Sequence, residues 1–229
     1  MTPDSLTITP TNDSERYIQD RDLNLTAAVR CKSYGLFSSL LASSHEIDVG
    51  KQLREVAGMD NFCVYGIDLG ALCGTYLSVD KLARKNEYSR LFEIGDSGPP
   101  VAIREQQQFG QISGIREDLV RFYEFFDYKI HQHYAWAPDH ISVILEFTHL
   151  LCYYESVVSE DQLSYQLAQY DFVSRHLVDW APIFADLIDN VQPDSLYADI
   201  ARSLCLFITR DHEWQASTIF PMERSGDNG

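Results

Sequence analysis

The sequence is short of positive charge. Its 229 residues include 18 Lys plus Arg against 34 Asp plus Glu, which gives a formal net charge of −16. Such an excess of carboxylates repels phosphate backbones and anionic lipid headgroups over a Debye length of about 8–10 Å. We therefore expect no nucleic-acid partner and no attraction to a membrane surface, whereas a basic partner is favoured.

Cysteine is also scarce, and long apolar runs are missing. The five cysteines, Cys31, Cys63, Cys73, Cys152 and Cys205, are an odd number and form no CxxC pair. This spacing favours neither a disulfide framework nor a thiolate zinc site. The first residues show no signal-peptide pattern, and no stretch of about 18 uninterrupted apolar residues occurs. We expect a cytoplasmic protein with no stable membrane insertion.

The short motifs of several enzyme classes are absent as well. GxSxG, GxGxxG, GxxxxGK[ST] and HExxH do not occur, so neither a nucleophile elbow nor a phosphate-binding loop is predicted. Four histidines lie close together, but on one helix His131 and His133 would point about 200° apart, which does not suit a shared ion. The pair Glu146 and His149 has Glu-x-x-His spacing only once, whereas a di-iron bundle needs it on two helices.

The chain does hold a large apolar content, with 45% hydrophobic and 12% aromatic residues, which is enough to form a core. The apolar residues recur with a helical period almost throughout, and no segment shows strand alternation bounded by hairpin turns. We expect an all-α fold, a single-domain bundle of mostly antiparallel helices. A mobile polar arm over 1–22 should precede the helical domain at 23–212, and a mobile polar tail should follow at 213–229.

The expected helices are separated by one long loop. They run over 24–41, 48–59, one or two segments within 62–92, 115–130, 138–158, 159–178, a short segment after Pro182, and 195–209. The loop at 95–114 holds two prolines and four glycines, and internal loops of more than about 12–15 residues are usually functional or disordered. Pro138 suits a first helical position, where Asp139 would face the positive end of the helix dipole. Ser159 and Gln162 have the spacing of a capping box.

Two helices carry polar residues that invite interpretation. On the helix after Pro138, His140 shares a stripe with Ile144 and Phe147, while Glu146 and His149 lie on a narrow polar stripe. This predicts a central, mostly buried helix whose charged groups need partners, in either a structural network or a binding site.

The block 160–199 concentrates negative charge, with eight acidic residues and a single basic one. Its first helix has a polar face and an opposite apolar face: Gln162, Gln166, Gln169 and His176 against Leu163, Leu167, Tyr170 and Val173. The block is either a solvated face or a groove for a cationic peptide, which carboxylates would attract and apolar side chains would grip.

Several blocks together resemble the TorD family of redox-enzyme maturation chaperones. Trp136-Ala137-Pro138-Asp139-His140 followed by Leu145-Glu146-Phe147 is similar to the family's P-D-H…L-E-F signature. Further matches are Gln169, Phe172, Arg175-His176-Leu177, Trp180, Pro182, Phe184, Leu196-Tyr197 and Ile200-Ala201, with Arg116 to Leu119, Arg121-Phe122-Tyr123 and Tyr34-Gly35-Leu36 upstream. The long loop and the helix after it look closest to the delta proteins of the ethylbenzene, dimethyl sulfide, selenate and chlorate molybdoenzyme group.

The resemblance implies an all-helical cytoplasmic chaperone of the TorD-like type, not an enzyme. It would bind the apo catalytic (alpha) subunit of a dimethyl sulfoxide reductase-type molybdoenzyme, hold its twin-arginine leader, and assist molybdenum cofactor insertion before Tat export. It implies no cofactor of its own beyond transient contact with molybdopterin guanine dinucleotide, and a monomer or homodimer. The residues expected at the leader and client site are Trp136, Pro138, Asp139, His140, Glu146, Tyr123, Arg121, Gln169, His176 and Trp180.

Within that site we expect Asp139 and carboxylates of 160–199 to accept the cationic part of the leader, with His140 shaping the pocket. Asp139 could instead act only as a first-turn residue that stabilises its own helix by ~0.3–1 kcal/mol. Two other functions stay open from the residues: a small helical metal-dependent hydrolase that uses His140, Glu146 and His149, or a structural assembly subunit retained in the mature complex.

Overall fold

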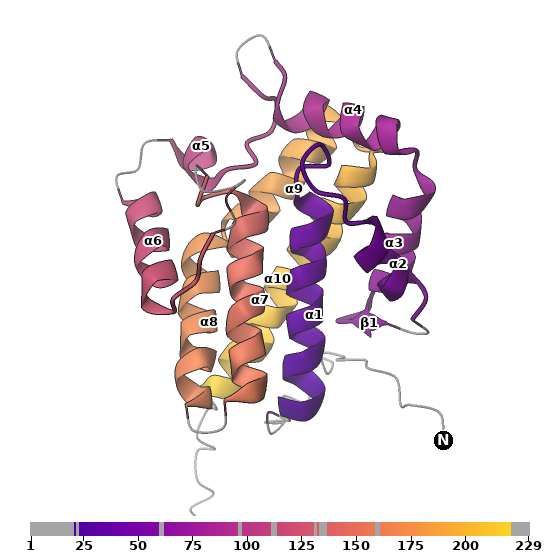
Figure 1. Ribbon diagram of the computed structural model, residues 1–229. Helices are drawn as coiled ribbons and strands as arrows, with labels where there is room; N and C mark the ends of the chain where they lie inside the picture. Colours follow the sequence, from indigo (N-terminus) through magenta and orange to yellow (C-terminus); the bar gives the residue numbers. More distant parts are fainter. Residues whose placement is uncertain are drawn as a thin grey trace, which may run out of the picture.

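Helices dominate the computed structural model, which describes residues 21, 23–59, 62–95, 98–110, 114–130, 132, 137–158 and 161–220 (Figure 1). Its elements are α1 (Leu23–Leu41), α2 (Gly50–Ala57), β1 (Cys63–Val64), β2 (Ile67–Asp68), α3 (Leu69–Ser78), α4 (Lys81–Phe92), α5 (Glu105–Phe109), α6 (Ile115–Phe125), α7 (Ile141–Val157), α8 (Gln162–His176), α9 (Trp180–Val191) and α10 (Leu196–Ile219). The all-α class is confirmed, with one short hairpin added.

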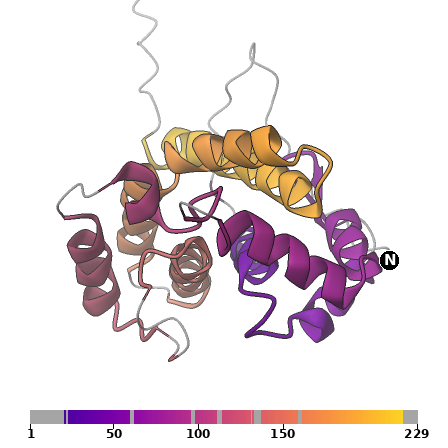
Figure 2. The ribbon, with the colours of Figure 1, turned by 90° about the horizontal axis from the view of Figure 1, so that it is seen from above.

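The helices α1, α7 and α8 stand side by side in the middle of the molecule, and α10 runs behind them (Figure 1). Seen from above, α9 and α10 lie along one side of this layer (Figure 2). Ser38 near the end of α1 donates a hydrogen bond to the Ser142 carbonyl at the start of α7. Phe147 and Phe172 form a ring contact between α7 and α8. The expected antiparallel packing is therefore confirmed for these neighbours.

The core is built around α7, as its sequence predicts. Ten of its 17 residues are buried, and a helix that is apolar on most faces must be covered by others. The ring of Phe147 contacts aromatic rings from α6, the segment after α6, and α8: Phe122, Tyr123, Phe126, Tyr128 and Phe172. The centre of the bundle is thus an aromatic cluster with Phe147 in its middle.

The hairpin of β1 and β2 was not expected. Its strands have two residues each, paired Cys63 with Asp68 and Val64 with Ile67, which is too short for alternation to be visible in the sequence. The turn places both Tyr65 and Gly66 at positive φ, 51° and 78°, as a tight primed hairpin turn requires. Tyr65 is held there because its hydroxyl donates to Asp211 and its carbonyl accepts from Arg210.

Several helix limits differ from the expected ones. The helix expected to begin at Pro138 begins at Ile141, after an N-cap at His140. The turn α5 lies inside the expected loop, and α6 stops at Phe125, short of 130. The Ser159 capping box lies outside the described residues, and α8 follows Asp161.

At the C-terminal end, α9 and α10 are both longer than predicted. Helix α9 begins at Trp180 and tolerates Pro182 because that residue lies in its first turn, where a missing N–H breaks no helical bond. Helix α10 continues to Ile219, past Glu213, where a polar tail was expected. The extension is stabilised by side chains that face inward, including the fully buried Gln215.

The two faces expected on α8 do not divide into one buried and one exposed. Leu163 and Leu167 of the apolar face are 59% and 40% exposed, whereas Gln169 and His176 of the polar face are buried. The reason is electrostatic, because Gln169 hydrogen-bonds Arg30 and Glu155, and His176 pairs with Glu105. A polar side chain faces the interior where buried charged groups form hydrogen bonds with it.

Among the helices of the described segments, none combines the length and the apolarity that a membrane crossing needs.

We predict that the Phe147 cluster dominates the stability of the bundle. Phe147→Ala should lower the free energy of unfolding by about 3–5 kcal/mol, since it leaves a cavity among five rings. Phe125→Ala is the matched control, because Phe125 is 82% exposed, and a change within about 0.5 kcal/mol is expected there. Urea unfolding followed by circular dichroism measures both, and equal losses in the two variants would contradict a core centred on Phe147.

Candidate functional site

The turn Pro138-Asp139-His140 lies against the chain that leads into α5. Residues Arg104 and His140 form an isolated antiparallel bridge. The Glu105 N–H donates to the Asp139 carbonyl at 2.9 Å, and the Ile141 N–H donates to the Ile103 carbonyl at 3.1 Å. The signature turn is therefore bound by backbone hydrogen bonds to the middle of the long loop.

Asp139 is fully buried and has cationic partners of its own. Arg104 donates to its Oδ1 from Nε at 3.2 Å and from Nη2 at 3.0 Å, and the Gln106 N–H lies 3.3 Å from Oδ2. The Nε of Arg116 is 3.8 Å from Oδ1. A buried carboxylate without such partners costs several kcal/mol. The prediction of a first-turn dipole role is wrong, because Asp139 precedes the helix, and its charge is compensated by arginines.

His140 caps α7 and is neutral at physiological pH. Its Nδ1 accepts from the Ser142 N–H at 3.2 Å and lies 2.8 Å from the Ser142 hydroxyl. Its Nε2 lies 3.3 Å from the hydroxyl oxygen of Tyr88 on α4. Burial lowers the pKa of His140 to about 4, because a charged imidazolium in the interior loses its hydration.

A second buried pair joins α5 to α8. The Nδ1 of His176 lies 3.1 and 3.0 Å from the two carboxylate oxygens of Glu105, and its Nε2 is 3.4 Å from Oδ2 of Asp118 on α6. Burial raises the pKa of Glu105, against the lowering effect of His176. One imidazole thus links three elements around the signature turn.

Tyr123 completes the cluster from α6. Its hydroxyl donates to the Pro138 carbonyl at 2.9 Å, and its ring contacts Phe147 with centroids 4.9 Å apart. Five of the predicted site residues, Pro138, Asp139, His140, Tyr123 and His176, are therefore brought together around α5.

The other predicted residues lie apart from this cluster. Arg121 is exposed on α6, and exposed Glu146 accepts from the Tyr128 hydroxyl at 2.9 Å. Gln169 belongs to a different network, described below. The buried indole N–H of Trp180 has no hydrogen-bond partner among the described residues. Trp136 lies outside the described residues.

The three side chains of the hydrolase alternative contact different elements. His140 faces Ser142 and Tyr88, and Glu146 faces Tyr128, whereas the Nδ1 of His149 lies 2.7 Å from the Cys31 carbonyl on α1. Nowhere in the described segments do three or more His, Cys, Asp or Glu side chains gather as metal ligands would.

Sequence reasoning missed Arg104, Glu105 and Asp118 as members of the cluster. A signal for the first was present, because Arg104 is the one basic residue of the loop at 95–114. A buried acid such as Asp139 needs a cation, and this loop could supply only one.

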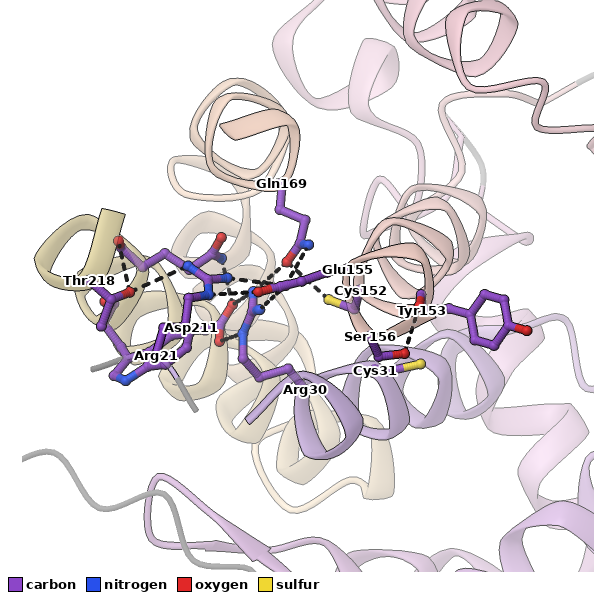
Figure 3. A network of polar contacts seen from close by, with 12 residues as sticks. Arg21, Arg30, Cys31, Cys152, Tyr153, Glu155, Ser156, Gln169, Asp211 and Thr218 are labelled. Atoms are coloured by element: carbon purple, nitrogen blue, oxygen red, sulfur yellow. Dashed lines mark hydrogen bonds and ion pairs between the residues drawn. The ribbon is translucent and has the colours of Figure 1, made fainter. Parts of the chain in front are cut away.

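A second polar network lies deep between α1, α7, α8 and α10 (Figure 3). Arg30, fully buried, donates to Asp211 at 2.6 and 3.0 Å, to Glu155 at 3.1 Å and to Gln169 at 2.7 Å. Gln169 in turn donates to Glu155 at 2.8 Å. Each of the three guanidinium nitrogens of Arg30 donates to an acceptor on another helix. Such charge-assisted hydrogen bonds are stronger than those between neutral groups.

Asp211 is fully buried and accepts hydrogen bonds from several side chains in addition to Arg30. The hydroxyls of Tyr34 and Tyr65 donate to it at 2.7 and 2.8 Å, and the Gln215 amide donates at 2.8 Å. Burial would raise the pKa of Asp211, but Arg30 and these hydrogen bonds hold it below its ordinary value. The carboxylate therefore stays ionised, with donors replacing its lost water.

Residues 69–186 match the protein family described as the nitrate reductase delta subunit. The chain is 34% identical over 123 residues to the selenate reductase assembly chaperone protein of Thauera selenatis, covering 52% of this chain and 63% of that protein. It is 36% identical over 111 residues to the chlorate reductase assembly chaperone protein of Ideonella dechloratans, covering 46% and 58%.

A further relative is the chaperone protein TorD of Vibrio cholerae, 35% identical over 85 residues, which are 36% of this chain and 39% of that protein. The resemblance to TorD and to the selenate and chlorate group is therefore confirmed. The chain spans less than two thirds of the length of each of these curated relatives.

We predict that Asp139→Asn lowers the free energy of unfolding by about 2–3 kcal/mol, because it leaves Arg104 in a largely buried place without its carboxylate. Asp161→Asn is the control, since Asp161 is exposed and should change stability by less than about 0.5 kcal/mol. Urea unfolding at neutral pH measures both. A fully stable Asp139→Asn variant would mean that the ion pair with Arg104 contributes nothing.

We also predict an acid-sensitive contribution from His140. Its pKa of about 4 in the folded chain lies below the ordinary 6.5, so the unfolded chain takes up the proton first, and stability falls as pH drops from 6.5 towards 4. The loss by pH 4.5 should be about 2–3 kcal/mol. His140→Gln should lack this part of the pH dependence. Parallel pH slopes of the free energy of unfolding in the two proteins would contradict a buried neutral His140.

Proposed function

The chain belongs to the nitrate reductase delta subunit family, and we propose that it is a chaperone, not an enzyme, for a dimethyl sulfoxide reductase-type molybdoenzyme. It binds the apo catalytic subunit in the cytoplasm, holds that subunit's twin-arginine leader, and assists insertion of the molybdenum cofactor before export. The observation that carries the proposal is the match to assembly chaperones of two reductases, supported by a family match at 69–186 that contains the signature turn.

The surface of α8 supports a role in peptide binding. Its first turns expose Leu163 and Leu167. Asp161, the N-cap residue of α8, is also exposed and forms no ion pair with the described residues. A twin-arginine leader offers guanidinium groups and an apolar stretch, which match a carboxylate and two leucines respectively. Leu163 and Leu167 are one helical turn apart, so they offer adjacent apolar contacts to the apolar stretch of the leader.

The signature turn is more suited to positioning helices than to contacting the leader. Asp139 is buried and paired with Arg104, so it acts first by fixing the loop with α5 to the start of α7. Direct contact between Asp139 and the leader stays a prediction. Titrating a leader peptide into Asp139→Asn and Asp161→Asn separates the two carboxylates, since only a residue that touches the leader should lose affinity in a folded variant.

Three further members of the charged block 160–199 are suited to steering. Asp179, Asp186 and Asp194 are exposed and form no ion pair with described residues, whereas Asp189 and Asp199 pair with Arg202. Unpaired carboxylates raise the rate at which a cationic peptide arrives more than the affinity with which it stays. The same proposal includes a transient contact with molybdopterin guanine dinucleotide while that cofactor is inserted into the client. In this proposal no cofactor stays bound to the chain itself.

We predict that the protein co-purifies from its native host with an unexported reductase catalytic subunit whose twin-arginine leader is intact. The physical reason is that the chaperone surface recognises the cationic leader, which is removed from the exported enzyme. Pull-down followed by mass spectrometry of the client's N-terminus is the measurement.

The matched control is a host whose client leader carries Lys-Lys in place of Arg-Arg, which should reduce recovery because a lysine ammonium cannot replace the planar guanidinium fork. Recovery of this chain with the finished, exported enzyme would instead make it a structural assembly subunit. A stoichiometric transition metal in the purified protein would favour the hydrolase.

A further inference from the structure

A guanidinium group of this chain occupies a pocket that other elements build. Arg21 lies ahead of α1, and its Nε and Nη2 donate to the two carboxylate oxygens of Glu155 at 2.7 and 3.2 Å. Its Nη1 lies 3.4 Å from the Thr218 hydroxyl, and its guanidinium carbon lies 4.7 Å from the centroid of the Trp214 ring. The side chain of Arg21 is 6% exposed and that of Glu155 is fully buried.

The walls of this pocket do not depend on the residue that fills it. Glu155 comes from α7, and Trp214 and Thr218 come from α10. Glu155 is also held by Arg30 at 3.1 Å and by the Gln169 amide at 2.8 Å, both on its Oε2 (Figure 3). The other oxygen, Oε1, is bound by Arg21. If Arg21 left, the carboxylate would keep its position and present Oε1 to a new donor.

The charge balance favours refilling the pocket with a cation. With Arg21 in place, two arginines face the carboxylates of Glu155 and Asp211. Without it, both carboxylates would share Arg30, and one buried negative charge would be uncompensated, which is costly in a medium of low dielectric constant. The vacated pocket would therefore attract positive charge.

The shape of the pocket selects arginine over lysine. A carboxylate that takes two parallel N–H donors fits the planar fork of a guanidinium, and an aromatic face beside it stacks on that plane. A lysine ammonium would offer a single point of contact to Glu155 and would be harder to dehydrate. The bidentate grip of Glu155 on Arg21 and the Trp214 ring are both seen.

Arg21 is also suited to leaving. It precedes α1, which begins at Leu23, so its backbone is outside the helix whereas the pocket walls are within helices. Burial and the neighbouring Arg30 both lower the pKa of Arg21. The loss of hydration and the repulsion from Arg30 therefore both oppose the binding of this cation.

We propose that Glu155, Trp214 and Thr218 form a binding site for an arginine side chain of a partner chain, and that Arg21 occupies it as an internal competitor. A partner's arginine enters only when the Arg21 side chain withdraws, so Arg21 sets a threshold for binding. The inference rests on the proposed function, in which the client's leader carries arginines, and it adds a site for one of them together with a competitor within the chain.

The test removes the competitor and supplies the guanidinium from solution. In the full chain, Arg21→Ala should bind N-acetylarginine amide about tenfold or more tightly than the wild type does, and about tenfold or more tightly than it binds N-acetyllysine amide. Titration calorimetry gives the affinities. The same ligand should raise the melting temperature of Arg21→Ala, whereas urea at equal concentration should not.

The matched control is the double variant Arg21→Ala with Glu155→Gln. It restores the charge balance between Arg30 and Asp211, so it should fold, yet it should lose the binding of N-acetylarginine amide. Equal affinity in the single and double variants, or equal affinity of Arg21→Ala for the arginine and lysine amides, overturns the proposal. So does an Arg21→Ala variant that binds no better than the wild type.

A second measurement covers the case in which Arg21→Ala does not fold. High concentrations of N-acetylarginine amide should displace Arg21 in the wild-type chain and change the fluorescence of Trp214, and the change should vanish in Trp214→Phe. If the lysine amide gives the same change as the arginine amide, or if neither gives one, the pocket is not an arginine site.

Discussion

The bundle depends on keeping one buried arginine satisfied. Arg30 on α1 meets Asp211 on α10, Glu155 on α7 and Gln169 on α8 at a single point in the interior. The network reaches the β1–β2 hairpin through the Tyr65 hydroxyl. A buried ion pair gains little net stability from its own attraction, since desolvation offsets it, but losing one partner is severely destabilising. These contacts therefore constrain how the helices are arranged more than they add to stability.

The helix α7 is constrained in this manner at both ends. Glu155 in its last turns belongs to the Arg30 network, and Asp139, just ahead of its N-cap, is bound by Arg104. Between the two lies the aromatic cluster around Phe147, which is apolar and has no such directional demand. Polar contacts at the ends therefore position a helix whose middle is stabilised by burial. The loop with α5 and the side chain of Arg21 are attached at those two ends.

Much of this fold follows from the sequence because it depends on local periodicity. The central place of α7 could be predicted from its apolar stripes. The presence of Pro138, Asp139 and His176 in one cluster could be predicted from the blocks that resemble the family. What could not be predicted depends on distant partners. The inward side of α8 is set by Arg30 and Glu105, which attract Gln169 and His176, and the length of α10 by Asp211 and Gln215. Pairing between residues far apart in the sequence leaves no periodic pattern. The role of Arg104, 35 positions from Asp139, and the contacts of Arg21, 134 positions from Glu155, therefore could not be predicted.

The Arg30 network has a consequence for how this sequence can vary. Replacing Arg30 alone would leave Asp211 and Glu155 as uncompensated buried acids, and replacing either acid alone would leave excess positive charge. Simultaneous replacement of a buried ionic group by well-packed apolar side chains is often neutral or stabilising. Single substitutions at positions 30, 155 and 211 should therefore destabilise the fold, whereas a joint replacement of these three charged side chains by apolar ones that fill the same volume should be tolerated.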